Sequence, residues 1–221
     1  LKEKIEFKPQ SATGIRAPHF VFYIRDYLAR KYGEDSLGER GYRVITTLDY
    51  DLEAKAEEVA KKWAEKNEKT FNAENAGIVA TDPETGQILA MVGSRDYFDK
   101  EIEGNYNVTT ADRQPGSSFK PFIYATAFNK GFTPDTVLFD LPTEFQTTCD
   151  ATGKALPGHN QKDCYMPDNY DGKFRGPMTL REALAQSINL PAVEAVYLAG
   201  VRDSIKLAED MGIKSLTELD K

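Results

Sequence analysis

The chain is most informative at Arg113-Gln114-Pro115-Gly116-Ser117-Ser118-Phe119-Lys120-Pro121, where a helix is predicted to begin. Residues three apart at a helix start lie on one face, so the side chains of Ser117 and Lys120 can meet, whereas Ser118 points to another side. A serine hydroxyl becomes an effective nucleophile only when a neighbouring base takes its proton. Lysine can be that base if burial lowers its pKa toward neutrality. The spacing therefore makes Ser117 a candidate nucleophile and Lys120 its candidate base.

A second pair of polar residues, Ser187 and Asn189, stands at a break between two predicted helices. Thr179 and Glu182 have the spacing of a capping box for the first helix, and Pro191 suits the first turn of the second. A break of this kind can direct a hydroxyl and an amide into one cleft. Either motif alone is typical of ordinary helix ends, so the hypothesis of an active site depends on finding both in one chain.

Upstream of the serine, the pattern predicts two helices and three strands. The first helix begins at Pro18 and ends at Gly33. The β-branched run 42–48 predicts a strand, and an amphipathic helix follows it. The nearly continuous apolar runs 76–82 and 87–93 predict a hairpin in a sheet that is covered on both faces. The apolar face of the amphipathic helix, expected in the core with the aromatic residues of 20–27, consists of Leu52, Ala56, Val59, Ala60 and Trp63.

Downstream of the serine, the pattern is mainly helical. One helix is expected up to Gly131, and further helices are expected after Thr179, after Pro191 and over 202–211. Residues 140–177 form a long polar stretch rich in Asp, Asn, Gly and Pro, and loops of that length usually have a function. Few strands and many helices predict an α+β fold whose sheet lacks partner strands, which indicates an incomplete domain.

Composition limits the classes of function. The net charge of -7 argues against a broad nucleic-acid surface, because phosphate binding needs clustered positive charge. No apolar run is long enough to cross a bilayer. The cysteines (Cys149, Cys164) and histidines (His19, His159) lack tight ligand spacing, which argues against a zinc site, and no cofactor is expected. The cysteines could close a loop as a disulfide, which would indicate an oxidising compartment, or remain two free thiols.

The motifs resemble those of class A penicillin-binding proteins, the bifunctional synthases of peptidoglycan. S-x-x-K with S-D-N and K-T-G is the set of motifs that β-lactamases and penicillin-binding proteins share. The resemblance covers nearly the whole chain. It rests on residues 17–21, 46–49, 90–93, 96–97, 105–107, 113–121, 179–184 and 187–193.

This resemblance implies a serine acyl-enzyme mechanism. Ser117 would attack the carbonyl of the penultimate D-alanine of a peptidoglycan stem peptide and release the terminal D-alanine. An amino group of a neighbouring strand would then accept the acyl group, which forms a cross-link. Lys120 would be the general base, Ser187 would relay a proton to the leaving group, and Asn189 would hold the substrate amide and Lys120. β-Lactam antibiotics would acylate Ser117 as mimics of the substrate.

The resemblance also implies a penicillin-binding/serine β-lactamase-like transpeptidase fold and a domain organisation. Residues 1–48 would connect to a glycosyltransferase domain, and residues 49–221 would be the N-terminal part of the transpeptidase domain. A membrane anchor outside these residues would hold the protein at the extracytoplasmic face. Two departures matter: the glycosyltransferase domain and the Lys-Thr-Gly motif, whose strand supplies an oxyanion-hole N–H, are both missing. We therefore expect part of a longer protein that is inactive alone.

Two other classes of function remain open. A D,D-carboxypeptidase or β-lactamase would pass the acyl group to water, although the connector-like segments within 17–49 argue against it. A non-catalytic penicillin-binding or scaffolding module would keep the motifs without turnover. Labelling by a fluorescent penicillin separates this module from the enzymes, and product analysis separates the two enzymes from each other.

Overall fold

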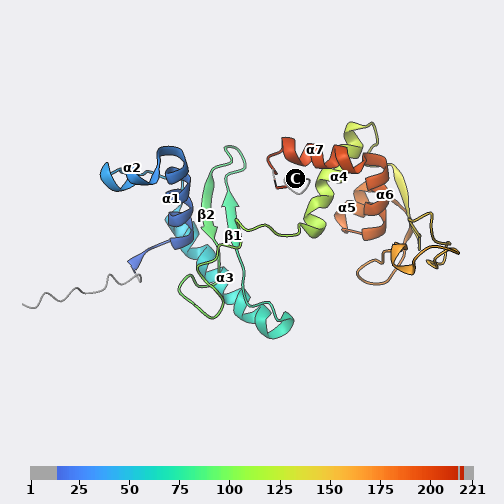
Figure 1. The fold of residues 1–221 in the computed structure, drawn as a ribbon, viewed down its shortest axis with the longest axis horizontal. Coiled ribbons are helices and arrows are strands. Elements are labelled where there is room, and N and C mark those ends of the chain that lie inside the picture. The colour runs from blue at the N-terminus through green and yellow to red at the C-terminus, as the bar shows by residue number, and fades with distance from the viewer. Residues whose placement is uncertain (1–13, 214, 217–221) are drawn as a thin grey trace, which may run out of the picture. The chain divides into compact units, whose positions relative to one another are not determined.

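The computed structural model describes residues 14–213 and 215–216. Within them the chain forms two compact units that divide between Ala111 and Asp112. Each unit combines helices with a two-stranded antiparallel sheet, so the predicted α+β character is confirmed (Figure 1). The boundary between residues 48 and 49 stays a prediction. None of the helices in the described part of the chain has the length and apolarity needed to span a bilayer.

The first unit contains the predicted helices and the predicted hairpin. α1 begins at Pro18 and ends before Gly33, whose φ of 84° suits glycine. Asp49 caps α3, because its carboxylate accepts hydrogen bonds from two backbone N–H groups of the first turn at 3.0 Å each. The elements are α1 (Pro18–Tyr32), α2 (Glu34–Glu39), α3 (Tyr50–Phe71), β1 (Ile78–Thr81) and β2 (Ile88–Val92).

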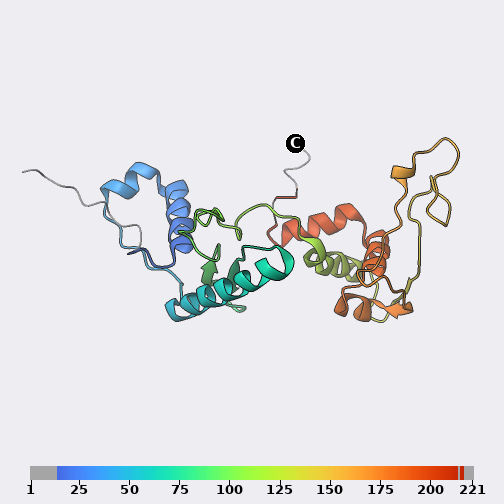
Figure 2. The same ribbon diagram turned by 90° about the horizontal axis from the view of Figure 1, so that it is seen from below.

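The core of this unit is built on both faces of β2. Side chains alternate between the two faces of a strand. Ala90 and Val92 therefore pack against α3, while Met91 packs against Phe20 of α1. Figure 2 shows the ribbon of the hairpin between α1 and α3. The prediction of a sheet covered on both faces holds for β2. It fails for β1, where Val79 is 46% exposed.

The segment 42–48 is not a strand, although its β-branched residues predicted one. It pairs with no strand among the described residues, and Ile45 is 84% exposed. The segment is tied to the hairpin only at its end, where Thr47 Oγ1 donates to the carbonyl of Ile88 at 2.6 Å. β propensity measures how well side chains pack on a sheet, so it cannot produce a strand without a partner.

Trp63, which the pattern predicts in the core, is instead 47% exposed. The aromatic residues of 20–27 divide in the same way, since Phe20 is buried and Tyr27 is exposed. The face of α3 that packs on β2 contains fewer residues than the apolar pattern indicated. Its residues are mostly alanines, which allow the helix to approach the strand closely. That buried face consists of Glu53, Ala56, Ala60 and Ala64.

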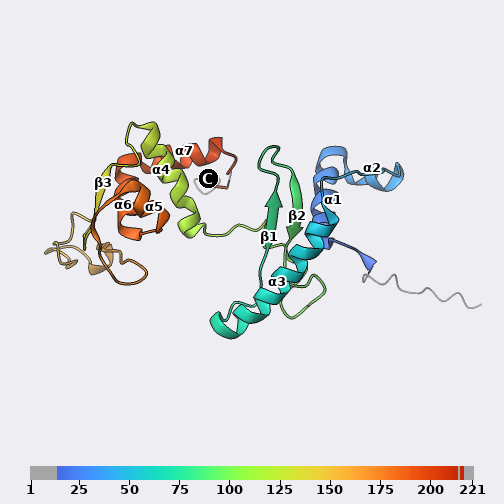
Figure 3. The ribbon, with the colours of Figure 1, turned by 180° about the vertical axis from the view of Figure 1, so that it is seen from behind.

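The second unit contains the helices predicted downstream of the serine (Figure 3). Thr179 and Glu182 form the predicted capping box at the start of α5. Gly200, with φ 81°, follows the last residue of α6 as predicted. The elements are η2 (Gly116–Phe119), α4 (Lys120–Asn129), β3 (Val137–Asp140), η3 (Gln161–Asp163), β4 (Gly176–Thr179), α5 (Leu180–Ala185), α6 (Asn189–Ala199) and α7 (Val201–Asp210).

Two short strands, β3 and β4, do not follow from the sequence pattern. They pair antiparallel, with Asp140 opposite Gly176. β4 begins with Gly176 and Pro177, and both residue types are depleted in strands, so its local sequence carries no strand signal. The loop of 141–175 brings the two strands together. Leu138 and Met178 from these strands join the core that α4, α5 and α6 form.

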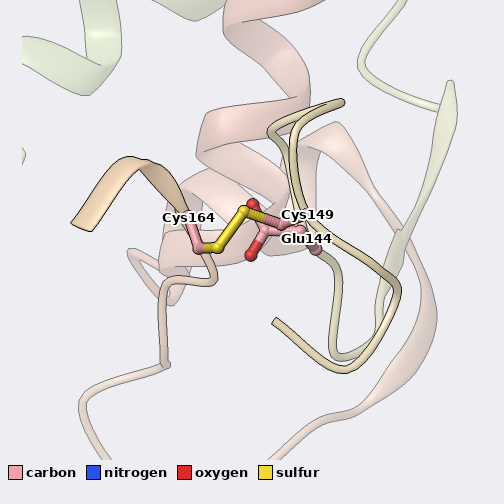
Figure 4. A group of neighbouring side chains, drawn as sticks. All are labelled: Glu144, Cys149 and Cys164. Carbon is pink, nitrogen blue, oxygen red and sulfur yellow. A yellow bond between two sulfur atoms is a disulfide. The ribbon is translucent and has the colours of Figure 1, made fainter. Parts of the chain in front are cut away.

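Cys149 and Cys164 form a disulfide within this loop, so they are not the two free thiols that the sequence left open. Their Cα atoms are 5.7 Å apart, within the range that a disulfide requires. Figure 4 shows the bridge beside the carboxylate of Glu144. The bond closes a loop across a sequence separation of 15 residues.

Removal of this disulfide should destabilise the second unit. We expect the double variant Cys149→Ser/Cys164→Ser to lose about 3 kcal/mol of unfolding free energy, because the open chain regains the entropy of a loop of this length. Denaturant titration of the oxidised wild type and the variant measures the loss. The reduced wild type is the matched control and should behave as the variant does. Equal stability of the three forms would contradict the expectation.

Candidate active site

Ser117 lies in the 3₁₀ turn η2, directly before α4. Gly116 begins the turn with φ 53°, a conformation that glycine adopts without steric cost. The backbone N–H of Lys120 donates to the carbonyl of Ser117 and closes the turn. Residues i and i+3 eclipse in such a turn, which places Ser117 and Lys120 on the same side of the chain. The contact between their side chains stays a prediction. The Ser117 side chain is exposed and has no hydrogen bond to Lys120 among the described residues.

Lys120 is brought together with the two residues of the second motif. Its Nζ lies 3.3 Å from Ser187 Oγ and 2.9 Å from Asn189 Oδ1. It also donates to the backbone carbonyls of Ser187, at 2.6 Å, and Ile188, at 3.2 Å. The lysine is only 8% exposed. The structure thus unites three of the four predicted site residues around one ammonium group.

Burial lowers the pKa of Lys120 from its ordinary value. The surrounding oxygen atoms favour the charged ammonium form, whereas removal from water disfavours it. Desolvation outweighs the oxygens, so the pKa moves in the direction that a general base needs. A neutral lysine amine in this position could accept a proton from a hydroxyl that approaches it.

Ser187 adopts an unusual backbone conformation between α5 and α6. Its φ is 55°, in the left-handed region that non-glycine residues rarely occupy. Its own N–H donates to Leu184 O, and the next N–H, of Ile188, donates to Ala183 O, each at 3.0 Å. These two bonds end α5 and turn the chain sharply. The turn directs both the carbonyl and the hydroxyl of Ser187 toward Lys120.

Two buried polar residues near the site were not singled out by the sequence. Asn169 accepts hydrogen bonds from the backbone N–H groups of Asn189 and Leu190, and it donates to Asp140 at 2.6 Å. The sequence placed Asn169 in a polar loop without a role. No spacing rule could have found this role, because the partners that join Asn169 to α6 and to Asp140 lie 20 or more residues away along the chain.

One group in the described part of the chain has the donor types of a metal site. It consists of Glu144, Cys149 and Cys164, whose ligand atoms lie within 4.8 Å of one another. Metal binding by cysteine requires thiolates, and here the two sulfur atoms are bonded to each other. In the disulfide form this group therefore lacks the sulfur donors of a metal site.

Comparison with known proteins identifies the family to which this chain belongs. The family profile described as "Penicillin binding protein transpeptidase domain" matches residues 76–220. The chain belongs to this family, and the resemblance to class A penicillin-binding proteins is confirmed. It is 34% identical to penicillin-binding protein 2D of Bacillus subtilis, over 96% of the chain and 29% of that protein. It is also 34% identical to penicillin-binding protein 1A of Rickettsia bellii, over 63% of the chain and 16% of that protein.

Solved structures show the same fold. The crystal structure of penicillin-binding protein 1A from Haemophilus influenzae matches 91% of the chain and 42% of that protein's chain, with a TM-score of 0.75 and 21% identity. Penicillin-binding protein 2 of Pseudomonas aeruginosa matches 76% of the chain and 37% of its own, with a TM-score of 0.54 and 22% identity. The predicted transpeptidase fold is confirmed. The chain spans less than half the length of each of these four proteins.

Proposed function

We propose that this chain carries the nucleophile of a peptidoglycan D,D-transpeptidase. Ser117 Oγ forms a bond to the carbonyl carbon of the penultimate D-alanine, and the peptide bond to the terminal D-alanine breaks. Lys120 takes the serine proton, Ser187 relays a proton to the leaving amine, and Asn189 holds the substrate amide. The observation that carries the proposal is the contact of the buried Lys120 Nζ with Ser187 and Asn189 at the end of the Ser117 turn.

The second half of the reaction returns the proton. An amino group of a neighbouring stem peptide attacks the acyl carbon, the ester bond to Ser117 breaks, and Ser117 regains its proton. β-Lactams stop the cycle because they acylate Ser117 and leave slowly. We further propose that this chemistry takes place at the extracytoplasmic face of a bacterial membrane. The Cys149–Cys164 disulfide supports that location, since such bonds persist in oxidising compartments.

We also propose that a longer protein completes the site. Its partners would be a glycosyltransferase domain and the remainder of the transpeptidase domain with Lys-Thr-Gly. Two observations support this proposal: the chain spans only 29% of penicillin-binding protein 2D, and an apolar hollow of about 340 Å³ borders the Ser117 turn. The apolar residues that line this hollow are Pro115, Phe119, Ile123, Val196, Val201, Ile205 and Leu216.

Product analysis tests the reaction itself. A protein that carries this chain and extends through Lys-Thr-Gly is incubated with a stem-peptide donor and an amine acceptor, and the products are identified by mass spectrometry. We expect a cross-linked peptide and free D-alanine. Release of D-alanine with the hydrolysed donor alone would identify a D,D-carboxypeptidase. If neither the cross-linked peptide nor free D-alanine forms, and penicillin forms no adduct, the protein is a non-catalytic module.

Residues 1–221 alone should react with penicillin at least about 10² times more slowly than the protein extended through Lys-Thr-Gly. Loss of one oxyanion-hole donor typically costs 10²–10³ in rate, and an unfinished cleft leaves Lys120 more hydrated. Stopped-flow or quenched labelling with a fluorescent penicillin compares the two proteins. A matched extended protein in which the Lys-Thr-Gly lysine is changed to alanine controls for folding. Equal rates for the short and long proteins would contradict the proposal.

A further inference from the structure

The first turn of α6 receives its cap from a distant loop. Ile188 precedes the helix, and no side-chain hydrogen bond from this position caps it. The first N–H groups of a helix have no partner within the helix. Here those of Asn189 and Leu190 donate to Asn169 Oδ1 at 3.1 and 3.2 Å. Asn169 is 5% exposed, so a buried side chain outside the helix satisfies the start of α6.

A buried carboxylate fixes the orientation of the Asn169 amide. Its Nδ2 donates to Asp140 Oδ1 at 2.6 Å and to the carbonyl of Lys173 at 2.8 Å. Asp140 is fully buried, and its Oδ2 accepts from the backbone N–H of Arg175 at 2.9 Å. The Arg175 guanidinium lies 3.7 Å from the same oxygen. A flipped amide would put Nδ2 against two N–H donors and Oδ1 against a carboxylate, so only one orientation satisfies every group.

The same loop orients the side chain of Asn189. Its Nδ2 donates to the backbone carbonyl of Asp168 at 3.1 Å, which leaves Oδ1 to accept from Lys120 at 2.9 Å. Asp168 and Asn169 therefore fix both the side-chain amide and the backbone N–H of Asn189. The location of the Lys120 ammonium follows from this turn, because its other contacts are the carbonyls of Ser187 and Ile188 and the hydroxyl of Ser187.

We propose that Asn169 is a positioning residue of the active site. Anchored by Asp140, it holds the first turn of α6 so that Ser187 and Asn189 surround Lys120. This role rests on the proposed function, and Asn169 acts through α6, since its side-chain hydrogen bonds in the described part of the chain go to Asp140, Lys173 and the N–H groups of α6. Displacement of a catalytic group by about 1 Å can cost 10² in rate, so a loose turn would slow acylation even in a folded protein.

The test compares two asparagines of one loop. Asn169→Ala removes the cap of α6, whereas Asn160→Ala removes a similar cap from η3, where Asn160 Oδ1 accepts from Lys162 N at 3.0 Å. Both are made in the protein extended through Lys-Thr-Gly, and acylation at saturating fluorescent penicillin is measured at a temperature where melting curves show each variant folded. We expect Asn169→Ala to acylate at about a tenth of the wild-type rate or less, and Asn160→Ala to match wild type.

A charge swap provides a second variant if Asn169→Ala does not fold. Asn169→Asp keeps an acceptor for α6 but places a carboxylate against Asp140, so it should acylate at least as slowly as the alanine variant. Adding Asp140→Asn supplies an amide donor and should recover part of the lost rate. Full recovery is not expected, because the Lys173 carbonyl still faces an oxygen. A swap that recovers nothing in a folded protein contradicts the proposal.

A measurement independent of acylation separates this role from a structural one and from failure of the proposed function. NMR titration of ¹³C-lysine-labelled protein gives the pKa of Lys120, whose signal is assigned with Lys120→Arg. We expect Asn169→Ala to raise this pKa toward the ordinary lysine value, while Asn160→Ala leaves it unchanged. If wild type itself is not acylated, the proposed function fails, and this titration alone decides the role of Asn169. If Asn169→Ala leaves the Lys120 pKa unchanged, or acylates at the wild-type rate, the positioning role of Asn169 is wrong.

Discussion

Ser117→Ala should abolish covalent labelling by penicillin in the protein extended through Lys-Thr-Gly. Only Ser117 has the three-residue spacing to Lys120, and the 3₁₀ turn that joins them keeps both on one side of the chain. Alanine lacks the oxygen that forms the acyl bond, so no adduct can form at this position. Intact-protein mass spectrometry measures the result as the presence or absence of the added β-lactam mass.

Ser118→Ala is the matched control for this experiment. Ser118 neighbours Ser117, is also exposed and lies in the same turn. It is only two residues from Lys120, a spacing that does not place two side chains on one face. We expect the Ser118 variant to be labelled more weakly than wild type but to keep its adduct. A β-lactam adduct that survives in Ser117→Ala, or disappears only in Ser118→Ala, would show that the nucleophile has been assigned to the wrong serine.

Lys120→Arg should slow acylation at least about 10²-fold, the usual scale for the loss of a general base. The guanidinium keeps the positive charge but stays protonated above pH 12, so it cannot accept the serine proton. It is also larger than an ammonium group, and the four oxygen contacts around Lys120 Nζ lie between 2.6 and 3.3 Å. The rate constant at saturating penicillin measures the loss.

The pH dependence of the acylation rate provides a second test of the role of Lys120. A general base works only when deprotonated, so wild-type acylation should rise with pH through the pKa of Lys120, which burial places below the ordinary lysine value. Lys120→Arg should lose this rise. Lys130→Arg is the control, because Lys130 follows the same helix α4 but pairs with Asp203. A near-normal rate in Lys120→Arg would show that Lys120 acts only through its charge.

The arrangement explains why the two motifs are needed together. Lys120 alone would be a cation at the start of a helix, and Ser187 and Asn189 alone would be a turn between two helices. Because Lys120 Nζ donates to both residues, one buried ammonium joins α4 to the start of α6. Burial lowers the pKa of Lys120 from its ordinary value, in the direction that the proposed general base requires.

The sequence alone determined those parts of the protein that depend on local pattern. The helices, the capping box of Thr179 and Glu182, and the hairpin of β1 and β2 follow from spacing and from turn residues that act within a few positions. The placement of Ser117 one turn before Lys120 also follows from spacing. The motifs around these residues are specific enough to identify the transpeptidase family, because they are short runs of neighbouring residues.

Only the tertiary structure decided the features that join distant residues. Among the described residues it left 42–48 without a partner strand. It also paired β3 with β4 across a long loop and closed the disulfide that the sequence left open. It also brought Asn169 to the first turn of α6 and Asp140 to the side-chain amide of Asn169. Each of these features depends on how elements far apart in the sequence pack together. A local sequence pattern does not determine which distant residues come into contact.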